Sequence, residues 1–190
     1  MTCRRFATQS EVLHAVVERL RSQISRYNEA NCFISDQPVP SFFPSGREVC
    51  TVSPGAGQFG DALFTGAGIR TLTEDAQVIV TPLIRHKKDR AGQSEITLQS
   101  EYDGLLVRKG EILSALLYGD HDLEIEDERP RTPEEVAEQP VVMRKILRNQ
   151  ITPTSCQAPG EVRVGKYELT GMSINFAAPF DWALFDVSNT

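Results

Sequence analysis

The sequence of 190 residues contains no long hydrophobic run. A helix that crosses a membrane needs about 20 consecutive, mostly apolar residues, and no stretch comes near that length. Residues 1–8 hold Arg4 and Arg5 but lack the apolar segment that a secretory signal requires. We therefore expect a protein that is made in the cytoplasm and has no membrane as a partner.

Cysteine and histidine are few and scattered. The cysteines form no CxxC pair, and no two cysteines or histidines lie at the spacing of zinc ligands. In a reducing compartment such cysteines are usually small buried hydrophobic residues. The sequence therefore predicts no metal site. The residues considered are Cys3, Cys32, Cys50, Cys156, His14, His86 and His121.

Positive charge is also in short supply. The chain has 20 Lys and Arg against 26 Asp and Glu, a formal net charge of −6. General nucleic-acid binding needs a basic excess to neutralise phosphates, so we expect no sequence-specific nucleic-acid partner. The one basic cluster holds Arg85, Lys87, Lys88 and Arg90. A solvated turn is its default interpretation, and an electrostatic contact with an acidic partner or with DNA is the alternative.

One glycine motif, Gly55–Gly60, has the GxGxxG spacing of dinucleotide-binding loops. Such a site places the pyrophosphate at the N-terminus of a helix that starts inside the motif. Residues 61–68 show no helical stripe and contain further glycines, so we predict a glycine-rich loop and no cofactor.

The acidic run Asp120–Glu126 has oxygen ligands at alternate positions, as a calcium loop does. A calcium loop needs glycine at its sixth position, which is Ile125 here, so a charged edge strand is favoured. No nucleophile elbow or recognisable carboxylate pair is present, and we predict that the protein is not an enzyme. A catalytic triad assembled from distant residues stays open as an alternative.

The composition is that of a globular protein, with 40% hydrophobic and 24% charged residues. We predict a single α+β domain over residues 1–190, with residues 1–8 as an N-terminal tail. The clearest helix is Thr8–Tyr27, where Thr8 and Glu11 form a capping box and an apolar stripe recurs at helical spacing. A second long helix is predicted from Ser94 to Tyr118, although Gly104 and Gly110 weaken it. Both helices should pack on a small mixed or antiparallel sheet.

The remaining segments are predicted as strands and loops. The strands are Cys32–Ile34, Glu48–Val52, Gln77–His86, a short edge strand at 123–126 and a C-terminal hairpin that turns at Gly165. The hairpin joins Glu161–Val164 to Tyr167–Phe176, and Pro179–Trp182 forms the last turn. Residues 53–70 are a flexible glycine-rich loop or loose hairpin, and residues 127–140 an acidic loop. Val141–Ile151 is ambiguous between helix and strand, with strand favoured.

Aromatic residues supply the other candidate interface positions. Phe59 and Phe64 lie in the glycine-rich span, and Trp182 lies in the aromatic C-terminal region. Core packing explains most aromatic residues there, but an exposed Trp182 would be an interface anchor. Together with Arg85, Lys87, Lys88 and Arg90, these three are the candidate protein-interface residues.

The element order resembles the tail-terminator proteins of long-tailed bacteriophages. The matching segments are Ser10–Tyr27, Glu48–Val52, Gln77–His86, Ser94–Leu117 and Tyr167–Phe176. The resemblance implies a homohexameric ring in the virion that caps the tail tube and joins it to the head connector, with DNA passing through. Its partners would be other copies of itself, the tail tube protein and the connector or neck proteins. No single functional residue is carried over.

Two alternatives to a tail terminator remain open. The same features suit another neck component, namely a connector or stopper protein. A different class is an intracellular enzyme whose site lies beside the loop Gly55–Gly68.

Overall fold

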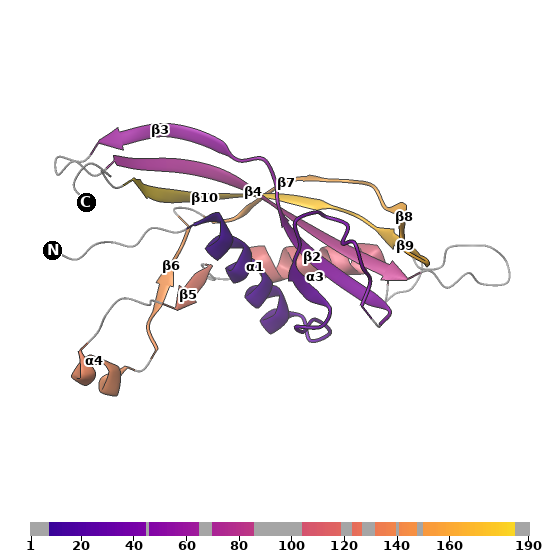
Figure 1. Ribbon diagram of the computed structural model, residues 1–190, viewed down its shortest axis with the longest axis horizontal. Coiled ribbons are helices and arrows are strands. Elements are labelled where there is room, and N and C mark those ends of the chain that lie inside the picture. Colours follow the sequence, from indigo (N-terminus) through magenta and orange to yellow (C-terminus); the bar gives the residue numbers. More distant parts are fainter. Residues whose placement is uncertain are drawn as a thin grey trace.

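The structure is a computed structural model that describes residues 8–44, 46–64, 70–85, 104–118, 123–126, 132–139, 141–147 and 150–184. It confirms the α+β class, with helices packed on a mostly antiparallel eight-stranded sheet (Figure 1). The helices are α1 (Gln9–Gln23), α3 (Leu105–Leu117) and α4 (Pro133–Glu138). The strands of the large sheet are β1 (Cys32–Ile34), β2 (Glu48–Pro54), β3 (Gln58–Phe64), β4 (Arg70–Arg85), β7 (Thr152–Cys156), β8 (Gly160–Val164), β9 (Tyr167–Gly171) and β10 (Ile174–Leu184).

Strand β4 is the centre of the large sheet. On one side it pairs with β2 over its C-terminal half and with β3 over its N-terminal half, both antiparallel. On the other side it pairs with β9 and then β10, again antiparallel. Strand β1 is a parallel edge next to β2, and β7 and β8 pair with β10 and β9. With about 3.3 Å per residue, the 16 residues of β4 span roughly 50 Å, which gives the molecule its length.

The two faces of the sheet have different covers. Helices α1 and α3 pack on one face, where alternate residues of β2, β4 and β10 join the core cluster with Val16, Leu20 and Ile112. The opposite face carries a smaller cluster in which Phe43, from the segment before β2, packs with Val49 and Leu83. Side chains alternate between the two faces along a strand, and both faces of the sheet are covered at β2. Successive residues of β2 are therefore buried almost without interruption.

Helix α1 begins as predicted and ends earlier than predicted. Thr8 and Glu11 form the expected capping box. The helix ends at Gln23 because Ile24 is extended, yet Ile24 and Tyr27 remain buried in the same core. The apolar stripe therefore marks the packed face correctly and overestimates the helix length. Of the predicted second helix, 105–117 is helical as α3 with the extended Gly104 as N-cap, while residues 94–103 lie outside the described part.

The predicted glycine-rich loop at 53–70 is wrong over its middle. Residues 58–64 form β3, so the alternative of a hairpin, β3 to β4, describes this part better. Consequently β4 begins at Arg70 and not at Gln77; its predicted last residue, His86, lies outside the described residues. The predicted last turn at Pro179–Trp182 is also wrong, because these residues continue β10 in register with β4. Long pairing with β4 overrides the local turn signal of proline.

The acidic segment is more ordered than predicted. Residues 133–138 form α4, with a capping box between Thr132 and Glu135 and Pro133 in the first turn. Strands β5 (Glu124–Glu126) and β6 (Met143–Lys145) pair antiparallel and carry this helix. The short edge strand and the preference for strand within Val141–Ile151 are therefore confirmed. The C-terminal hairpin is confirmed too, with Gly165 at φ 56°, although its second strand is split into β9 and β10.

Candidate protein interface

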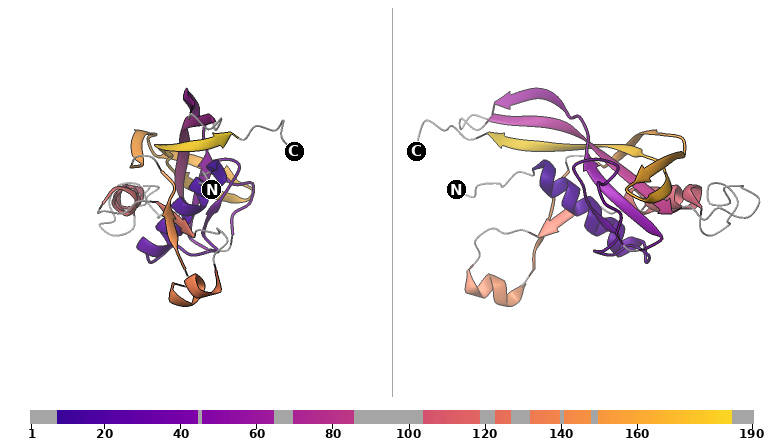
Figure 2. Two further views of the ribbon diagram at one scale, coloured as in Figure 1. Left: turned by 90° about the vertical axis from the view of Figure 1, so that its left-hand side faces the viewer. Right: turned by 45° about the vertical axis from the view of Figure 1, so that its right-hand side comes forward.

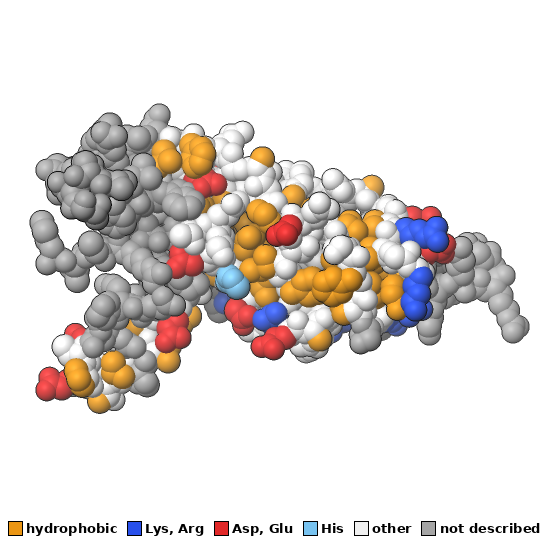
Figure 3. All heavy atoms as spheres, viewed as in Figure 1, with side chains coloured by type: hydrophobic (Ala, Val, Ile, Leu, Met, Phe, Trp, Pro, Cys, Tyr) orange, Lys and Arg blue, Asp and Glu red, His pale blue; other side chains and the backbone are white. Residues whose placement is uncertain are grey.

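The basic candidate residues lie at one end of the sheet. Arg85 is the last residue of β4, is exposed, and stacks its guanidinium 4.7 Å from the ring centroid of Tyr167. The ammonium of Lys166 approaches the same ring at 5.5 Å, and Tyr167 in turn packs on Phe43. Figure 3 shows Lys and Arg side chains gathered at this end of the visible face. Lys87, Lys88 and Arg90 lie outside the described residues.

The aromatic candidates lie at the other end of β4, on a ribbon of β3, β4 and β10 that extends past α1 (Figures 1 and 2). Phe59 is 68% exposed and stands opposite Glu74 of β4. Phe64 is opposite Arg70, and Trp182 is opposite Leu72 on the other side of β4. The pairing thus brings residues that are over 100 positions apart in sequence onto one ribbon. The side chains of Phe64 and Trp182 are outside the described part, so an exposed Trp182 stays a prediction.

The candidates form two surfaces and not one. Phe59 stands opposite Glu74, and Arg85 lies eleven residues further along β4, which corresponds to roughly 35 Å. The molecule therefore has a basic end, defined by Arg85 and Lys166. At the opposite end of the same strand it has an aromatic ribbon, formed by β3, β4 and β10, on which Phe59 is exposed and along whose backbone Phe64 and Trp182 lie.

The GxGxxG motif, Gly55–Gly60, forms the connection from β2 to β3 and the start of β3. The chain leaves β2 at Pro54 and re-enters the sheet as β3 at Gln58, so no helix follows the motif. A Cβ on Gly57 would overlap the carboxylate of Glu74, and one on Gly55 would lie 2.7 Å from the Cβ of Gln77. Gly55 is needed because the connection runs close against the Cβ of Gln77, whereas a side chain at 57 would displace the end of the Glu74 side chain. The motif thus leads into a strand that packs against β4, as the structural interpretation expects.

A partly buried network of ion pairs links α3 to the sheet. Arg108 is 1% exposed, and its Nε donates to the Glu48 carboxylate of β2 at 2.7 Å. Its Nη1 donates to Glu111 at 3.3 Å, and Arg26, after α1, donates to Glu111 at 3.1 Å. This network joins β2, α3 and the segment after α1, which are distant from one another in sequence. No sequence pattern predicts this network, because Arg108 has the spacing of an ordinary solvated charge on a leucine-rich helix.

A second buried polar group lies where β1 pairs with β2. Cys32 and Cys50 are register partners, and both thiols are fully buried beside Tyr27. Burial, and then the neighbouring Cys50 group, raises the pKa of the Tyr27 hydroxyl well above its usual value. Burial, and then Cys32, also raises the pKa of the Cys50 thiol. Since nucleophilic cysteines need a lowered pKa, Cys50 serves as a packed core residue.

A groove that the sequence did not predict lies between the C-terminal end of α1 and helix α3. It has a volume of about 650 Å³. Ile24, Val107 and Tyr118 supply apolar surface, and Arg26 and Glu111 supply its charged pair. Tyr118 is 82% exposed, and a Cβ on Gly110 would meet no atom within 4 Å, so the glycine opens the groove. Exposed apolar surface of this kind usually marks a contact with another molecule.

Two further findings concern the described residues. They contain no group of three or more His, Cys, Asp or Glu placed to hold a metal ion. They also contain no helix that is both long and apolar enough to cross a membrane.

Comparisons with known proteins do not assign the chain to a family. No protein-family model matches it, and no curated protein matches it significantly.

Proposed function

We propose that this protein is a structural subunit of the neck of a long-tailed phage, a tail terminator that forms a ring, caps the tail tube and joins it to the head connector. The observation that carries the proposal is the separation of two unlike contact surfaces along β4. The basic end lies at Arg85, and the aromatic ribbon with the exposed Phe59 lies roughly 35 Å away.

Unlike surfaces at opposite ends suit a cyclic assembly. In a ring each subunit presents one surface to a different surface of its neighbour, so each protomer needs two patches that differ in character. A symmetric dimer would need only one patch that is complementary to itself. The elongated sheet with helices on one face provides the two patches and leaves the ribbon free to contact a neighbour or an adjoining ring (Figure 2).

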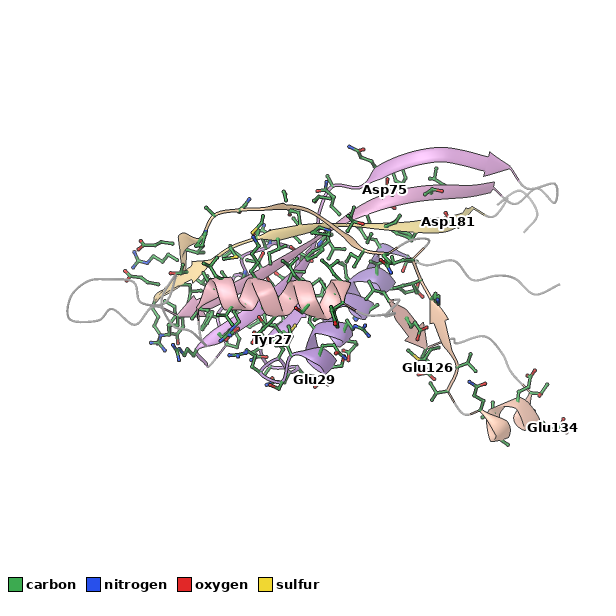
Figure 4. All side chains as sticks on the ribbon, turned by 180° about the vertical axis from the view of Figure 1, so that it is seen from behind. Tyr27, Glu29, Asp75, Glu126, Glu134 and Asp181 are labelled. Atoms are coloured by element: carbon green, nitrogen blue, oxygen red, sulfur yellow. The ribbon has the colours of Figure 1, made fainter. Side chains whose placement is uncertain are left out.

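The charge distribution supports the same arrangement. Figure 4 shows Glu126 on β5 and Glu134 on α4, which both project from the body. Figure 3 shows basic side chains at the opposite end of the molecule. Charges of opposite sign at a protomer's two ends orient approaching protomers and speed their head-to-tail association. They make the rate of assembly depend on ionic strength.

The experiment is a measurement of mass in solution. Size-exclusion chromatography with light scattering, over a wide range of protein concentration, should give one mass corresponding to a closed ring, for which we propose a hexamer. A monomer at all concentrations would contradict the proposal. The runner-up function, another neck component such as a connector or stopper, also forms a ring, and pull-down against purified tail tube protein separates the two.

A further inference from the structure

Residues 123–126, 132–139 and 141–146 form an arm that projects from the body. Strands β5 and β6 make a two-stranded ribbon with α4 at its tip, and all views place α4 away from the large sheet (Figures 1, 2 and 4). The base is fixed, because Leu123 and Ile146 are buried in the core and the amide of Ile146 donates to the carbonyl of Leu123 at 3.1 Å. The arm therefore leaves the body in a defined direction.

The described part of the arm combines a preorganised tip with exposed apolar side chains. Helix α4 has six residues, and so short a helix is marginal in water. It nevertheless carries a capping box at Thr132 and a proline in its first turn, both of which preorganise it. Val136, Val141 and Met143 on the arm are 42%, 51% and 50% exposed. The arm therefore carries three exposed apolar side chains on or next to a capped, preorganised tip.

The groove between α1 and α3 has the complementary character. Its lining includes Ile24, Val107 and Tyr118, and the exposed Leu117 adjoins it on α3. The acidic arm tip also finds a cation there: Arg26 keeps about a third of its side chain exposed while it pairs with Glu111. A guanidinium has five N–H donors, so Arg26 can donate to a second carboxylate in addition to that of Glu111.

We infer that the arm of one subunit docks in the α1–α3 groove of a second copy of this chain, with Val136 against the apolar lining and Glu134 near Arg26. The inference deepens the proposed ring and rests on it. Each copy carries one arm and one groove. In a closed ring every arm therefore occupies the groove of a neighbouring copy, and no groove is left empty. An arm that bound a different protein would leave all of the grooves open.

The test is disulfide trapping between two variants, in a background where Cys3 and the exposed Cys156 are replaced by serine. One variant carries Val136→Cys, and the other carries Ser114→Cys, a position that lines the groove. They are mixed, allowed to assemble and oxidised with copper phenanthroline. The control replaces Ser114→Cys by Thr154→Cys, an equally small and exposed position on β7.

The expected result is a covalent dimer between the Val136 and Ser114 variants and none with the Thr154 variant. Light scattering on the same samples separates the two claims. Rings that form without the dimer overturn the docking of the arm and leave the ring intact. Samples that stay monomeric overturn the proposed function and this inference together.

A binding measurement checks the energetics without cysteines. Val136 is 42% exposed, and burying that part of a valine side chain is worth enough that Val136→Ser should weaken assembly roughly three- to tenfold. Phe42→Ser removes a 62% exposed side chain elsewhere on the body and should leave assembly unchanged. Equal effects of the two substitutions would overturn the assignment of the arm.

Discussion

The ion pair between Arg108 and Glu48 should dominate the attachment of α3 to the sheet. Arg108 is 1% exposed and Glu48 is 13% exposed, and their side chains meet at 2.7 Å. Replacing Glu48 by leucine leaves the guanidinium buried with Glu111 at 3.3 Å as a remaining partner. Removing one member of such a buried pair costs about 3–5 kcal/mol, because the desolvation of the other charge is no longer compensated.

The magnitude can be checked by thermal unfolding followed by circular dichroism. At about 2–4 °C per kcal/mol for a chain of this size, the Glu48→Leu variant should melt roughly 6–20 °C below the wild type. Protein concentration must be held constant, because assembly itself stabilises the folded chain.

A double variant makes the prediction sharper. Arg108→Met in the Glu48→Leu background removes the buried positive charge that has lost its Glu48 partner. The double variant should therefore be more stable than Glu48→Leu alone. The reasoning would be refuted by a Glu48→Leu variant within about 1 kcal/mol of the wild type. It would also be refuted by a double variant whose loss equals the sum of the two single losses.

Three further predictions follow from the described residues. Leu20→Ala, at a fully buried position on the packed face of α1, should lower the free energy of unfolding measured in urea by about 2–5 kcal/mol. A decrease below about 1 kcal/mol would mean that α1 does not pack as described. The pKa of the Tyr27 hydroxyl is raised in the folded state, so its contribution to the free energy of unfolding is complete below about pH 10, the unfolded value, and is lost as the pH rises through the folded value. Tyr27→Phe should flatten this decline in stability with pH. An unchanged slope would show that Tyr27 does not cause the decline. Replacing Arg85, Lys87 and Lys88 by glutamate should slow assembly and alter its salt dependence while the circular dichroism spectrum is preserved; rings that form at the wild-type rate in low and high salt would exclude this cluster from the interface.

The sequence predicted the elements that have strong local signals. The capping box at Thr8 and the stripe through Leu20 located α1, because both features depend only on residues within one helix. The β-branched residues of Gln77–Arg85 located the second half of β4, and Gly165 located the C-terminal turn. These predictions needed no knowledge of what each segment packs against.

The parts that were missed depend on pairing between distant segments. The stretch 58–64 looks like a loop, because it contains Gly60 and follows Gly55 and Gly57, yet pairing with β4 makes it a strand. Pro179 looks like a turn residue, yet it lies opposite Asp75 in a continuous ladder. In both cases tertiary context overrides local propensity.

The contact surfaces show the same division. Sequence reasoning identified Arg85 and Phe59 as individual candidates but could not place them at opposite ends of one strand. The groove beside α3 was also missed, because the exposed Leu117 belongs to the apolar stripe of the predicted helix and was expected to be buried with it. Only the packing of α3 on the sheet decides which of its apolar residues remain outside.

The most direct test of the ring is electron microscopy of the purified protein. Negative-stain images should show closed rings of one size with a central opening, in which each protomer contacts its two neighbours through unlike surfaces. Single particles of monomer size at high protein concentration, or open filaments that do not close, would contradict the account.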